Sequence, residues 1–388
     1  MIGITKMATG QATVSQRLTY GGDKSTIPQK LVQAAEKPVP VMVWNTTSRC
    51  NLRCIHCYAN AGSVSDELST EEAKVFLDDL SEMKIPLMIF SGGEPIMRRD
   101  LCELASHITS RGIMCSLSTN GTLIDEDTAQ KLKECGVSYV GVSIDGEAET
   151  NDKFRGVNGA FDKAFQGLLN SRNAGIMTGI RFTVTRYNVK DVPPIIDLLA
   201  ENDIPRFCLY HLVPSGRAEF KDDITLKERR ELIDWLFHKA VQLHDDGYKT
   251  EILTVDNPVD GIYTYLKLKE TDEKLAEQAL EFLKYRGGDS SGFRLSNVDM
   301  VGDVHPNQFW WDYTIGNVRN QKFSDMWLNP TDDLLIKLRD KTRYLGGRCG
   351  KCKFKEVCGG FRLRAMRYGD LWGNEPDCYL TDEEIGIA

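Results

Sequence analysis

The sequence has no long hydrophobic run, which is the feature that a membrane-spanning helix requires. No stretch approaches the ~18 consecutive apolar residues of such a helix. The N-terminal part also lacks the apolar segment and the cleavage-site pattern of an export signal. We therefore expect a cytoplasmic protein with no membrane partner.

The sequence also lacks an excess of positive charge, internal repeats, low-complexity tracts and heptads. Lys and Arg number 48 against 56 Asp and Glu, so the formal net charge is −8. Bulk charge of this sign disfavours nucleic acid as a partner, and an anionic substrate would need a local basic pocket. With 388 residues, of which 41% are hydrophobic, the chain is long enough for an ordered core and two or three domains.

Cysteine is the residue type that stands out. The chain has 11 cysteines, an odd number, and a disulfide framework is a poor explanation in a cytosolic protein of this length. Three cysteines lie within residues 50–57 and three within 349–358, followed by Cys378. Two such clusters, one near each end of the chain, indicate metal or cluster ligands. The remaining four are scattered: Cys102, Cys115, Cys135 and Cys208.

Between the clusters, apolar strand patterns alternate with helical periodicity. The predicted strands are 39–44, 85–90, 114–118, 138–144, 178–185 and 206–212. The predicted helices are 70–84, 99–111, 125–135, 158–174 and 192–202. Six strand–helix units predict an α/β fold with a parallel sheet, two units short of a closed barrel. In such sheets the reactive groups lie on loops at the carboxyl ends of the strands.

Composition divides the chain into four parts. Residues 1–38 are polar and are predicted to form an N-terminal extension with one possible helix at 27–36. Residues 39–220 form the partial barrel. Residues 221–290 are charged and helical, and they are predicted to be a helical bridge packed on the barrel. Residues 291–388 are predicted to form a small domain with short strands at 293–295 and 304–305 and a helix at 323–327.

The first cluster places three thiolates in one tight loop, Cys50-x3-Cys54-x2-Cys57. A 4Fe–4S cluster normally takes four cysteines, so three would leave one iron open to bind a substrate or cofactor. A zinc site completed by His56, or three inert buried thiols, would be the plain alternatives.

The segment SRCNLRCIHCYA resembles the signature of the radical S-adenosylmethionine (SAM) superfamily. The resemblance implies a partial (β/α)6 barrel with a 4Fe–4S cluster on Cys50, Cys54 and Cys57. It further implies that the open iron chelates SAM and that reduction yields a 5′-deoxyadenosyl radical. In this family the aromatic position occupied by Tyr58 often lies close to the adenine.

Other strand ends agree with the same resemblance. The sequence SGGEP resembles the GGE motif, in which Gly92, Gly93 and Glu94 would meet the SAM amino group. The sequence SIDG at 143–146, followed by Arg155, resembles an arrangement in related enzymes that binds the carboxylate and the ribose of SAM. The alternative is a strand-end turn with a surface arginine. The further SAM contacts that the resemblance implies are Ser118, Asn120, Ser143, Asp145, Arg155 and Asn188.

The second cluster supplies four thiolates, which suits a fully ligated 4Fe–4S cluster. Its members are Cys349, Cys352, Cys358 and Cys378. Structural zinc is the alternative. The region resembles the SPASM/twitch extension of radical SAM enzymes. Fuller SPASM domains carry further cysteines where this chain has Asn307 and Arg362, so we expect one auxiliary cluster and two clusters in all.

The N-terminal segment and the sequence VHPNQFW resemble the haem-biosynthesis branch of the superfamily. This implies a tetrapyrrole substrate: loss of acetate side chains from 12,18-didecarboxysiroheme, giving iron-coproporphyrin III, with ferredoxin or flavodoxin as electron donor. The alternatives are a haem d1 biosynthesis side-chain enzyme, a peptide maturase and a non-catalytic iron–sulfur carrier. About 40 residues precede the first predicted strand, which is short for a peptide-recognition domain.

A flat polyanion requires local cations, and arginine suits carboxylates because it pairs with them in a bidentate manner. The candidates are Arg181, Arg186, Arg206, Arg217, Arg362, Arg364 and Arg367. His211 is the first candidate ligand for a substrate iron. Each arginine has the alternative of a solvated surface charge, and the histidine that of a satisfied structural residue.

Overall fold

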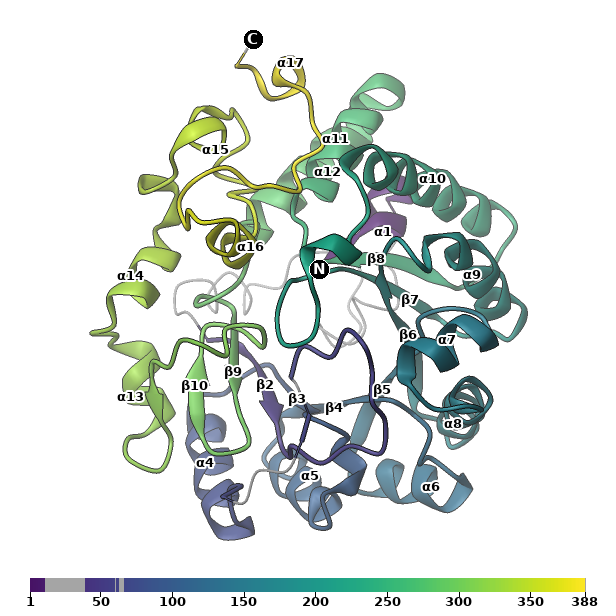
Figure 1. Ribbon diagram of the computed structural model, residues 1–388, viewed down its shortest axis with the longest axis vertical. Helices are drawn as coiled ribbons and strands as arrows, with labels where there is room; N and C mark the ends of the chain where they lie inside the picture. Colours follow the sequence, from purple (N-terminus) through teal and green to yellow (C-terminus); the bar gives the residue numbers. More distant parts are fainter. Residues whose placement is uncertain (11–38, 60, 63–65, 388) are drawn as a thin grey trace.

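The computed structural model describes residues 1–10, 39–59, 61–62 and 66–387. Its centre is a mixed sheet with the strand order β1-β8-β7-β6-β5-β4-β3-β2-β9-β10-β11. Strands β2 to β8 are parallel neighbours, and helices cover the outer side of the curved sheet (Figure 1). The predicted α/β partial barrel is therefore confirmed. The predicted helix at 27–36 lies outside the described residues.

Each predicted strand of the barrel is present, with ends shifted by a few residues. The parallel strands are β2 (Val41–Asn45), β3 (Leu87–Ser91), β4 (Met114–Thr119), β5 (Val137–Ser143), β6 (Met177–Val184), β7 (Arg206–His211) and β8 (Glu251–Val255). The helices between them are α4 (Thr70–Glu82), α5 (Leu101–Thr109), α6 (Glu126–Glu134), α7 (Ala148–Arg155), α8 (Ala160–Asn173), α9 (Val192–Glu201) and α10 (Leu226–Asp245). Short 3-10 turns occupy Pro95–Met97, Val189–Asp191, Phe220–Asp222 and Lys341–Arg343.

Local sequence explains where the longer helices begin. The Ser69 hydroxyl accepts from the Glu72 N–H and the Glu72 carboxylate accepts from the Ser69 N–H, which is a capping box at the start of α4. Thr225 and Glu228 make the same exchange at the start of α10. These pairs satisfy backbone donors that have no partner within the helix.

The segment predicted to be an entirely helical bridge also contains a strand. It folds as α10, β8, α11 (Val259–Thr271) and α12 (Glu273–Arg286), and β8 extends the parallel sheet beyond β7. β8 is only five residues long, with Glu251 and Thr254 among its apolar residues, and it lies between two helical patterns. Periodicity alone therefore does not separate it from them.

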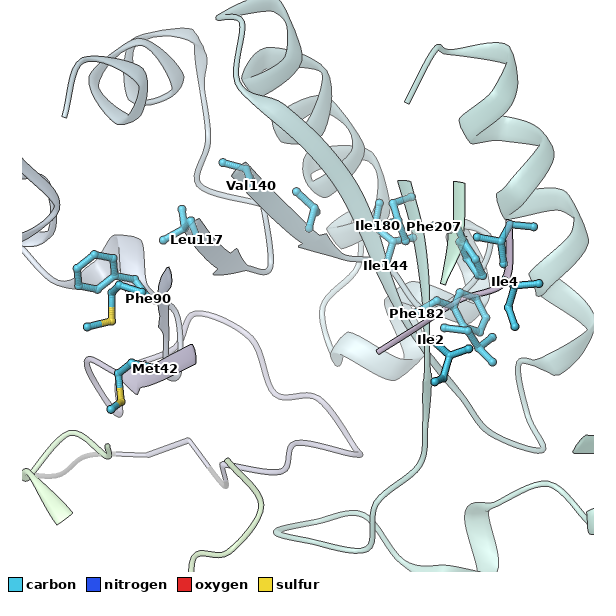
Figure 2. Close-up of a cluster of buried hydrophobic side chains, with 14 of the residues drawn as sticks. Ile2, Ile4, Met42, Phe90, Leu117, Val140, Ile144, Ile180, Phe182 and Phe207 are labelled. Carbon is cyan, nitrogen blue, oxygen red and sulfur yellow. The ribbon is translucent and has the colours of Figure 1, made fainter. Parts of the chain in front are cut away.

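The first ten residues belong to the barrel. β1 (Ile2–Gly3) pairs antiparallel with β8, and α1 (Ile4–Thr9) begins directly after it. The Ile4 side chain is fully buried. Figure 2 shows Ile2 and Ile4 beside the core residues Phe182 and Phe207. Residues predicted as part of an extension thus close one edge of the sheet.

At the other edge, the C-terminal segment continues the same sheet. β9 (Leu295–Val298) runs parallel to β2, while β10 (Asp303–His305) and β11 (Gly316–Asn317) are antiparallel additions. The predicted boundary near residue 291 therefore crosses a continuous sheet. The helices that follow are α13 (Phe323–Leu328), α14 (Asp333–Arg339), α15 (Gly347–Lys351), α16 (Arg362–Arg367) and α17 (Asp382–Ile385).

The core lies between the sheet and its helices. Met42, Phe90, Leu117, Val140 and Ile180 come from five consecutive strands and are fully buried (Figure 2). Burying side chains of this size contributes roughly 1.5–3 kcal/mol each. None of the helices within the described ranges is both long and apolar enough to cross a bilayer.

Candidate active site

A cavity of about 970 Å³ runs through the barrel. Its wall includes Cys50 and Gly92 at the carboxyl ends of strands, and Met114 and Ser138 near the amino ends. The cavity therefore extends along the length of the strands rather than forming only a shallow cleft at the loops.

The three cysteines of the first cluster line the mouth of this cavity. The Leu52 N–H donates to Cys50 Sγ at 3.4 Å, and the Arg155 guanidinium donates to Cys54 Sγ at 3.5 Å. Burial raises the pKa of Cys50 to about 11. Donors directed at sulfur stabilise a thiolate, so this donor set fits a 4Fe–4S cluster held by Cys50, Cys54 and Cys57.

The GGE segment lies against the chain that enters the cysteine loop. The Gly93 N–H donates to the Thr47 carbonyl at 2.7 Å, and the Glu94 N–H donates to the Arg49 carbonyl at 2.7 Å. A Cβ atom on Gly92 would stand 2.6 Å from the Thr47 carbonyl oxygen, and the φ of Gly92 is +137°. Both glycines line the cavity, where their bare backbone lets a ligand approach closely.

Glu94 is fully buried behind these glycines. Its carboxylate accepts from the Thr119 hydroxyl and from the Asn120 N–H, both at 2.8 Å. Burial raises the pKa of Glu94 to about 7. The carboxylate thereby ties β3 to the end of β4, and its predicted contact with the SAM amino group stays a prediction.

Arg155 joins the cysteine loop to a buried carboxylate. Its guanidinium pairs with Asp145, which also contacts His56 Nε2 at 3.1 Å. Burial favours the neutral acid, but the charges of Arg155 and His56 hold the pKa of Asp145 below its ordinary value. The Asn188 amide donates to the Asp145 carbonyl at 2.9 Å. Neither Asp145 nor Asn188 is among the described residues that line the cavity, so both support its wall from behind.

Four other predicted SAM contacts do line the cavity: Tyr58, Ser118, Asn120 and Ser143. The Tyr58 ring packs edge-on against Phe309, with ring centroids 5.2 Å apart. The Ser118 hydroxyl accepts from Arg181 at 2.7 Å. A predicted cofactor contact and a predicted substrate contact are thus direct neighbours.

The predicted substrate cations divide into two groups. Arg181, Arg206 and Arg217 line the cavity. Arg186 is exposed, and its guanidinium donates to the Lys221 carbonyl at 3.3 Å, outside the cavity. Arg367 pairs with Asp312 at 2.8 Å on the outer side. Arg186 follows the end of β6 and is exposed to solvent. The prediction that Arg186 is a substrate ligand is therefore not supported.

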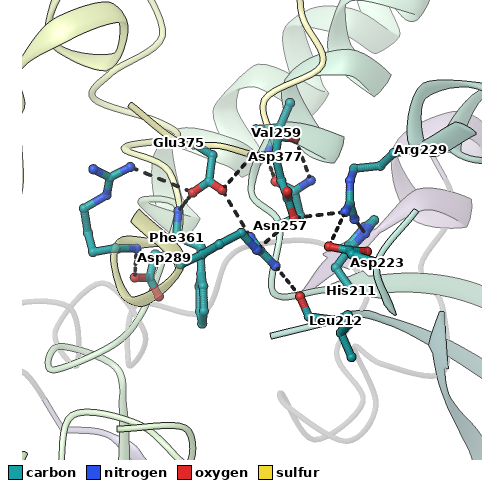
Figure 3. A network of polar contacts seen from close by, with 12 residues as sticks. His211, Leu212, Asp223, Arg229, Asn257, Val259, Asp289, Phe361, Glu375 and Asp377 are labelled. Carbon is teal, nitrogen blue, oxygen red and sulfur yellow. Dashed lines mark hydrogen bonds and ion pairs between the residues drawn. The ribbon is translucent and has the colours of Figure 1, made fainter. Parts of the chain in front are cut away.

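His211 lines the cavity, but its ring nitrogens are not available to bind iron in this arrangement. Its Nε2 contacts Asp260 Oδ2 at 2.7 Å, and its Nδ1 contacts the Arg229 guanidinium. Both ring nitrogens are therefore engaged, and the side chain is fully buried. Figure 3 shows His211 and Arg229 within a network of buried charges that continues to Asp377.

Arg364 and Arg362 belong to the same buried region and not to the substrate cavity. Arg364 pairs with Asp377 at 2.8 Å and Glu375 at 3.2 Å, and Arg362 donates to the Gly373 carbonyl at 2.8 Å. Arg364 also donates to the Leu212 carbonyl at the end of the barrel. These contacts fix the C-terminal segment on the barrel, because a buried charge requires a partner.

The cavity wall is strongly basic despite the net charge of the chain. Among the described lining residues, eight are Lys or Arg and one, Asp256, is acidic. Sequence reasoning missed Asp256, which directly follows the missed strand β8, and it missed Lys6, Lys84, Arg286 and Arg294. Burial raises the pKa of Asp256 to about 7. An apolar run that ends in Asp was the available signal for Asp256.

The second set of cysteines surrounds a separate small cavity of about 30 Å³. The Arg348 guanidinium donates to Cys378 Sγ at 3.0 Å, and the Glu375 N–H donates to Cys349 Sγ at 3.1 Å. Burial raises the pKa of Cys352, Cys358 and Cys378. Four sulfurs around one space, with donors directed at them, fit a cluster with four cysteine ligands.

Residues 44–199 match the family model described as Radical SAM superfamily. The chain is 47% identical to Fe-coproporphyrin III synthase of Methanosarcina barkeri, covering 100% of this chain and 99% of that protein. It is 39% identical to Pre-heme d1 synthase of Dinoroseobacter shibae, covering 96% and 94%. The Streptococcus suis SuiB structure with bound precursor peptide matches with a TM-score of 0.72 at 18% identity, covering 91% of this chain and 80% of that chain. At that identity the structural match shows the fold alone.

Proposed function

The chain belongs to the radical SAM superfamily, and from that premise we propose that it removes acetate side chains from 12,18-didecarboxysiroheme to give iron-coproporphyrin III. The full-length similarity to Fe-coproporphyrin III synthase supports this substrate. The observation that carries the proposal is the basic cavity. Eight of its described lining residues are Lys or Arg, and two of these, Arg155 and Arg206, pair with carboxylates behind the wall. The lining cations outnumber the carboxylates on and behind the wall, which suits a flat molecule with several carboxylates.

The size of the cavity agrees with this substrate class. At about 970 Å³ it lies at the upper end of the range for small-molecule sites, roughly 300–1,000 Å³. A tetrapyrrole is large for such a ligand, and it must share the space with SAM. A pocket that extends along the strands provides room for both molecules.

A 4Fe–4S cluster and SAM at the cavity mouth would supply the 5′-deoxyadenosyl radical that the reaction uses. Cys50, Cys54 and Cys57 hold the cluster, and Arg155 fixes the loop through Cys54. Gly92 and Gly93 leave the backbone accessible to SAM. The barrel walls exclude water and orient the macrocycle. One-electron chemistry suits the substrate, since an acetate on a saturated ring carbon has no easy ionic route for cleavage of its C–C bond.

We propose one auxiliary 4Fe–4S cluster at Cys349, Cys352, Cys358 and Cys378, with electron transfer as its role. The donors to Cys349 and Cys378 support a cluster at this position. Arg362, which stands where fuller SPASM domains carry a cysteine, places its guanidinium 3.8 Å from Cys349 Sγ. A reduced ferredoxin or flavodoxin is the expected electron source.

The second candidate is a side-chain reaction of haem d1 biosynthesis, which the 39% identity to Pre-heme d1 synthase supports. Both candidates require a polyanionic tetrapyrrole, so the basic cavity suits each of them. The tetrapyrrole product of the reaction distinguishes the two candidate functions.

The test is anaerobic turnover of the reconstituted protein with SAM, dithionite and 12,18-didecarboxysiroheme. We expect iron-coproporphyrin III together with 5′-deoxyadenosine. Both products are detected by chromatography and identified by their mass. 5′-Deoxyadenosine with an unchanged tetrapyrrole would contradict this substrate and direct the search to haem d1 intermediates. A variant with Cys50, Cys54 and Cys57 replaced by Ala is the matched control and should form neither product.

A further inference from the structure

The cysteine loop alternates between side chains that line the cavity and side chains that are exposed outside it. Leu52, Cys54 and His56 line the cavity. Arg53 and Ile55 lie between them in the sequence, are exposed, and do not belong to the described cavity wall. The loop therefore covers the outer side of one of its cysteines, Cys54, with a cation and an apolar side chain.

Two neighbouring segments extend this outer surface. The Ile55 N–H donates to the Phe154 carbonyl at 2.9 Å, which holds the loop against the last turn of α7. The Asn51 amide donates to the Thr122 hydroxyl at 2.8 Å, which joins the loop to the turn after β4. Each of the three segments carries one exposed apolar side chain: Ile55 (48% exposed), Leu123 (38%) and Val157 (36%).

These side chains form a candidate interaction surface. Single exposed apolar residues are ordinary, whereas several on adjoining segments mark a surface that binds a partner. We call Ile55, Leu123, Val157 and the two cations Arg53 and Lys153 the loop face. Lys153 is an exposed residue of the same last turn of α7.

The two cations give the loop face a positive rim. Within the described part of the chain, neither Arg53 nor Lys153 forms an ion pair with a carboxylate. The Asp152 carboxylate, next to Lys153, accepts from two backbone N–H groups at the start of α8. Glu149 lies one turn earlier on α7 and is exposed. The chain as a whole has a net charge of −8, so the loop face differs in sign from the average surface.

The chemistry behind the loop face indicates which partner it suits. The radical reaction starts with one electron delivered to the cluster of the cysteine loop, and the loop face is the outer surface of that loop. An acidic protein is repelled by most of a chain with this net charge and is steered to a local positive rim. Electron-transfer partners use small interfaces, and interfaces combine an apolar centre with a polar rim.

From this arrangement we propose that the loop face docks a small acidic electron-transfer protein. The reduced carrier gives up one electron and is oxidised, the cluster is reduced, and no bond forms or breaks in that step. This inference rests on the proposed function, since it assigns a binding surface to the electron donor that the reaction requires.

The test uses the full-length reconstituted protein and flavodoxin, an acidic flavoprotein, with affinity measured by anaerobic calorimetric titration. Wild-type affinity should fall as the ionic strength rises, because salt screens exposed charges. Lys153→Glu and Val157→Asp should each weaken binding about tenfold or more, since each places a negative charge against an acidic partner. The matched controls are Lys351→Glu, exposed beside Cys352 of the second cysteine set, and Val75→Asp, exposed on α4. Both controls should bind as the wild type does.

Formation of 5′-deoxyadenosine separates docking from damage to the cluster. With subsaturating reduced flavodoxin, Lys153→Glu and Val157→Asp should form it about tenfold more slowly than the wild type. With dithionite, a small reductant that needs no docking surface, both should match the wild type. Neither readout uses a tetrapyrrole, so a failure of this inference is distinguishable from a failure of the proposed substrate.

Several results would overturn the proposal. Wild-type affinity in both loop-face variants would exclude the loop face as the docking surface, and equal losses with both reductants would show that it only supports the cluster. Weaker binding in Lys351→Glu alone would move electron entry to the second cysteine set. A dimeric wild type that Val157→Asp converts to a monomer, measured by sedimentation, would identify a second copy of the chain as the occupant.

Discussion

Gly93 and Arg49 lie so close together that no side chain fits between them. A Cβ atom on Gly93 would stand 2.3 Å from the Arg49 carbonyl oxygen. Arg49 is the residue directly before Cys50, so the GGE segment of one loop sets the position of the cysteine loop. The two segments are joined further by the hydrogen bond from the Glu94 N–H to the Arg49 carbonyl.

Gly93→Ala should therefore displace the start of the cysteine loop. We expect loss of the SAM cluster, seen as a fall in iron content of about half, together with loss of SAM cleavage. The measurement is iron analysis and absorbance after anaerobic reconstitution. Gly346→Ala is the matched control, because its added Cβ would meet only a carbonyl oxygen at 3.7 Å. Normal iron content in Gly93→Ala would show that the loop tolerates displacement.

Replacement of Cys50, Cys54 and Cys57 by Ala should remove about half of the iron and all formation of 5′-deoxyadenosine. The physical reason is that three sulfurs from one loop are the proposed ligands of this cluster. Iron analysis and chromatography of the nucleoside are the measurements. SAM cleavage that survives in this variant would refute the assignment of the SAM cluster.

Replacement of Cys349, Cys352 and Cys358 by Ala should leave one cluster and again about half of the iron. Metal analysis of the wild type and the variant distinguishes an auxiliary cluster from structural zinc. If zinc occupied the site, the variant would lose zinc in place of iron. Unchanged iron content, with or without a loss of zinc, would contradict an auxiliary iron–sulfur cluster. Electron paramagnetic resonance of the variant should retain only the signal that responds to SAM.

Asp256 should make tetrapyrrole binding dependent on pH. Its pKa is raised to about 7 by burial, and an anionic ligand disfavours its charged form further. Affinity for iron-coproporphyrin III should therefore fall as the pH rises through about 7, when Asp256 becomes negative. Absorbance titrations between pH 6 and about 8.5 measure this. In Asp256→Asn the decline should be smaller and binding at the alkaline end tighter, and an unchanged decline would exclude Asp256 as its source.

Asp145→Asn should destabilise the protein strongly. The substitution leaves the buried Arg155 guanidinium without its anion, and breaking a buried pair in this way costs about 3–5 kcal/mol. The thermal unfolding midpoint of the metal-free protein measures the loss. Asp162→Asn, at an exposed position on α8, is the control and should leave the midpoint nearly unchanged. Equal midpoints for the two variants would mean that water reaches Arg155.

Features encoded over short distances could be predicted from the sequence. The order of strands and helices from 39 to 212 follows from periodicity within single segments. The cysteine loop and the glycines at 92–93 follow directly after strands, so their meeting at one end of the sheet was predictable. The structure places the residues of both motifs on one cavity wall.

Roles that depend on a distant partner could not be predicted in this way. His211 was expected to face a ligand, but Asp260 and Arg229 occupy both of its ring nitrogens. Arg364 was expected near the substrate, but Asp377 and Glu375 hold it in a buried network. Sequence shows that a side chain can bind an anion, but not which anion the fold brings to it.

The sequence by itself determined the chemistry at the cavity mouth, because cysteine spacing and strand-end glycines are local features of the chain. Only the tertiary structure decided how the cavity is closed and charged. β1 is two residues long, too short for any periodicity, and it pairs with β8 some 250 positions later. The helix that follows β1 places the Lys6 ammonium 4.6 Å from the centroid of the Phe282 ring at the cavity wall. Burial and long-range pairing are properties of the folded chain, and they decided which cations line the cavity.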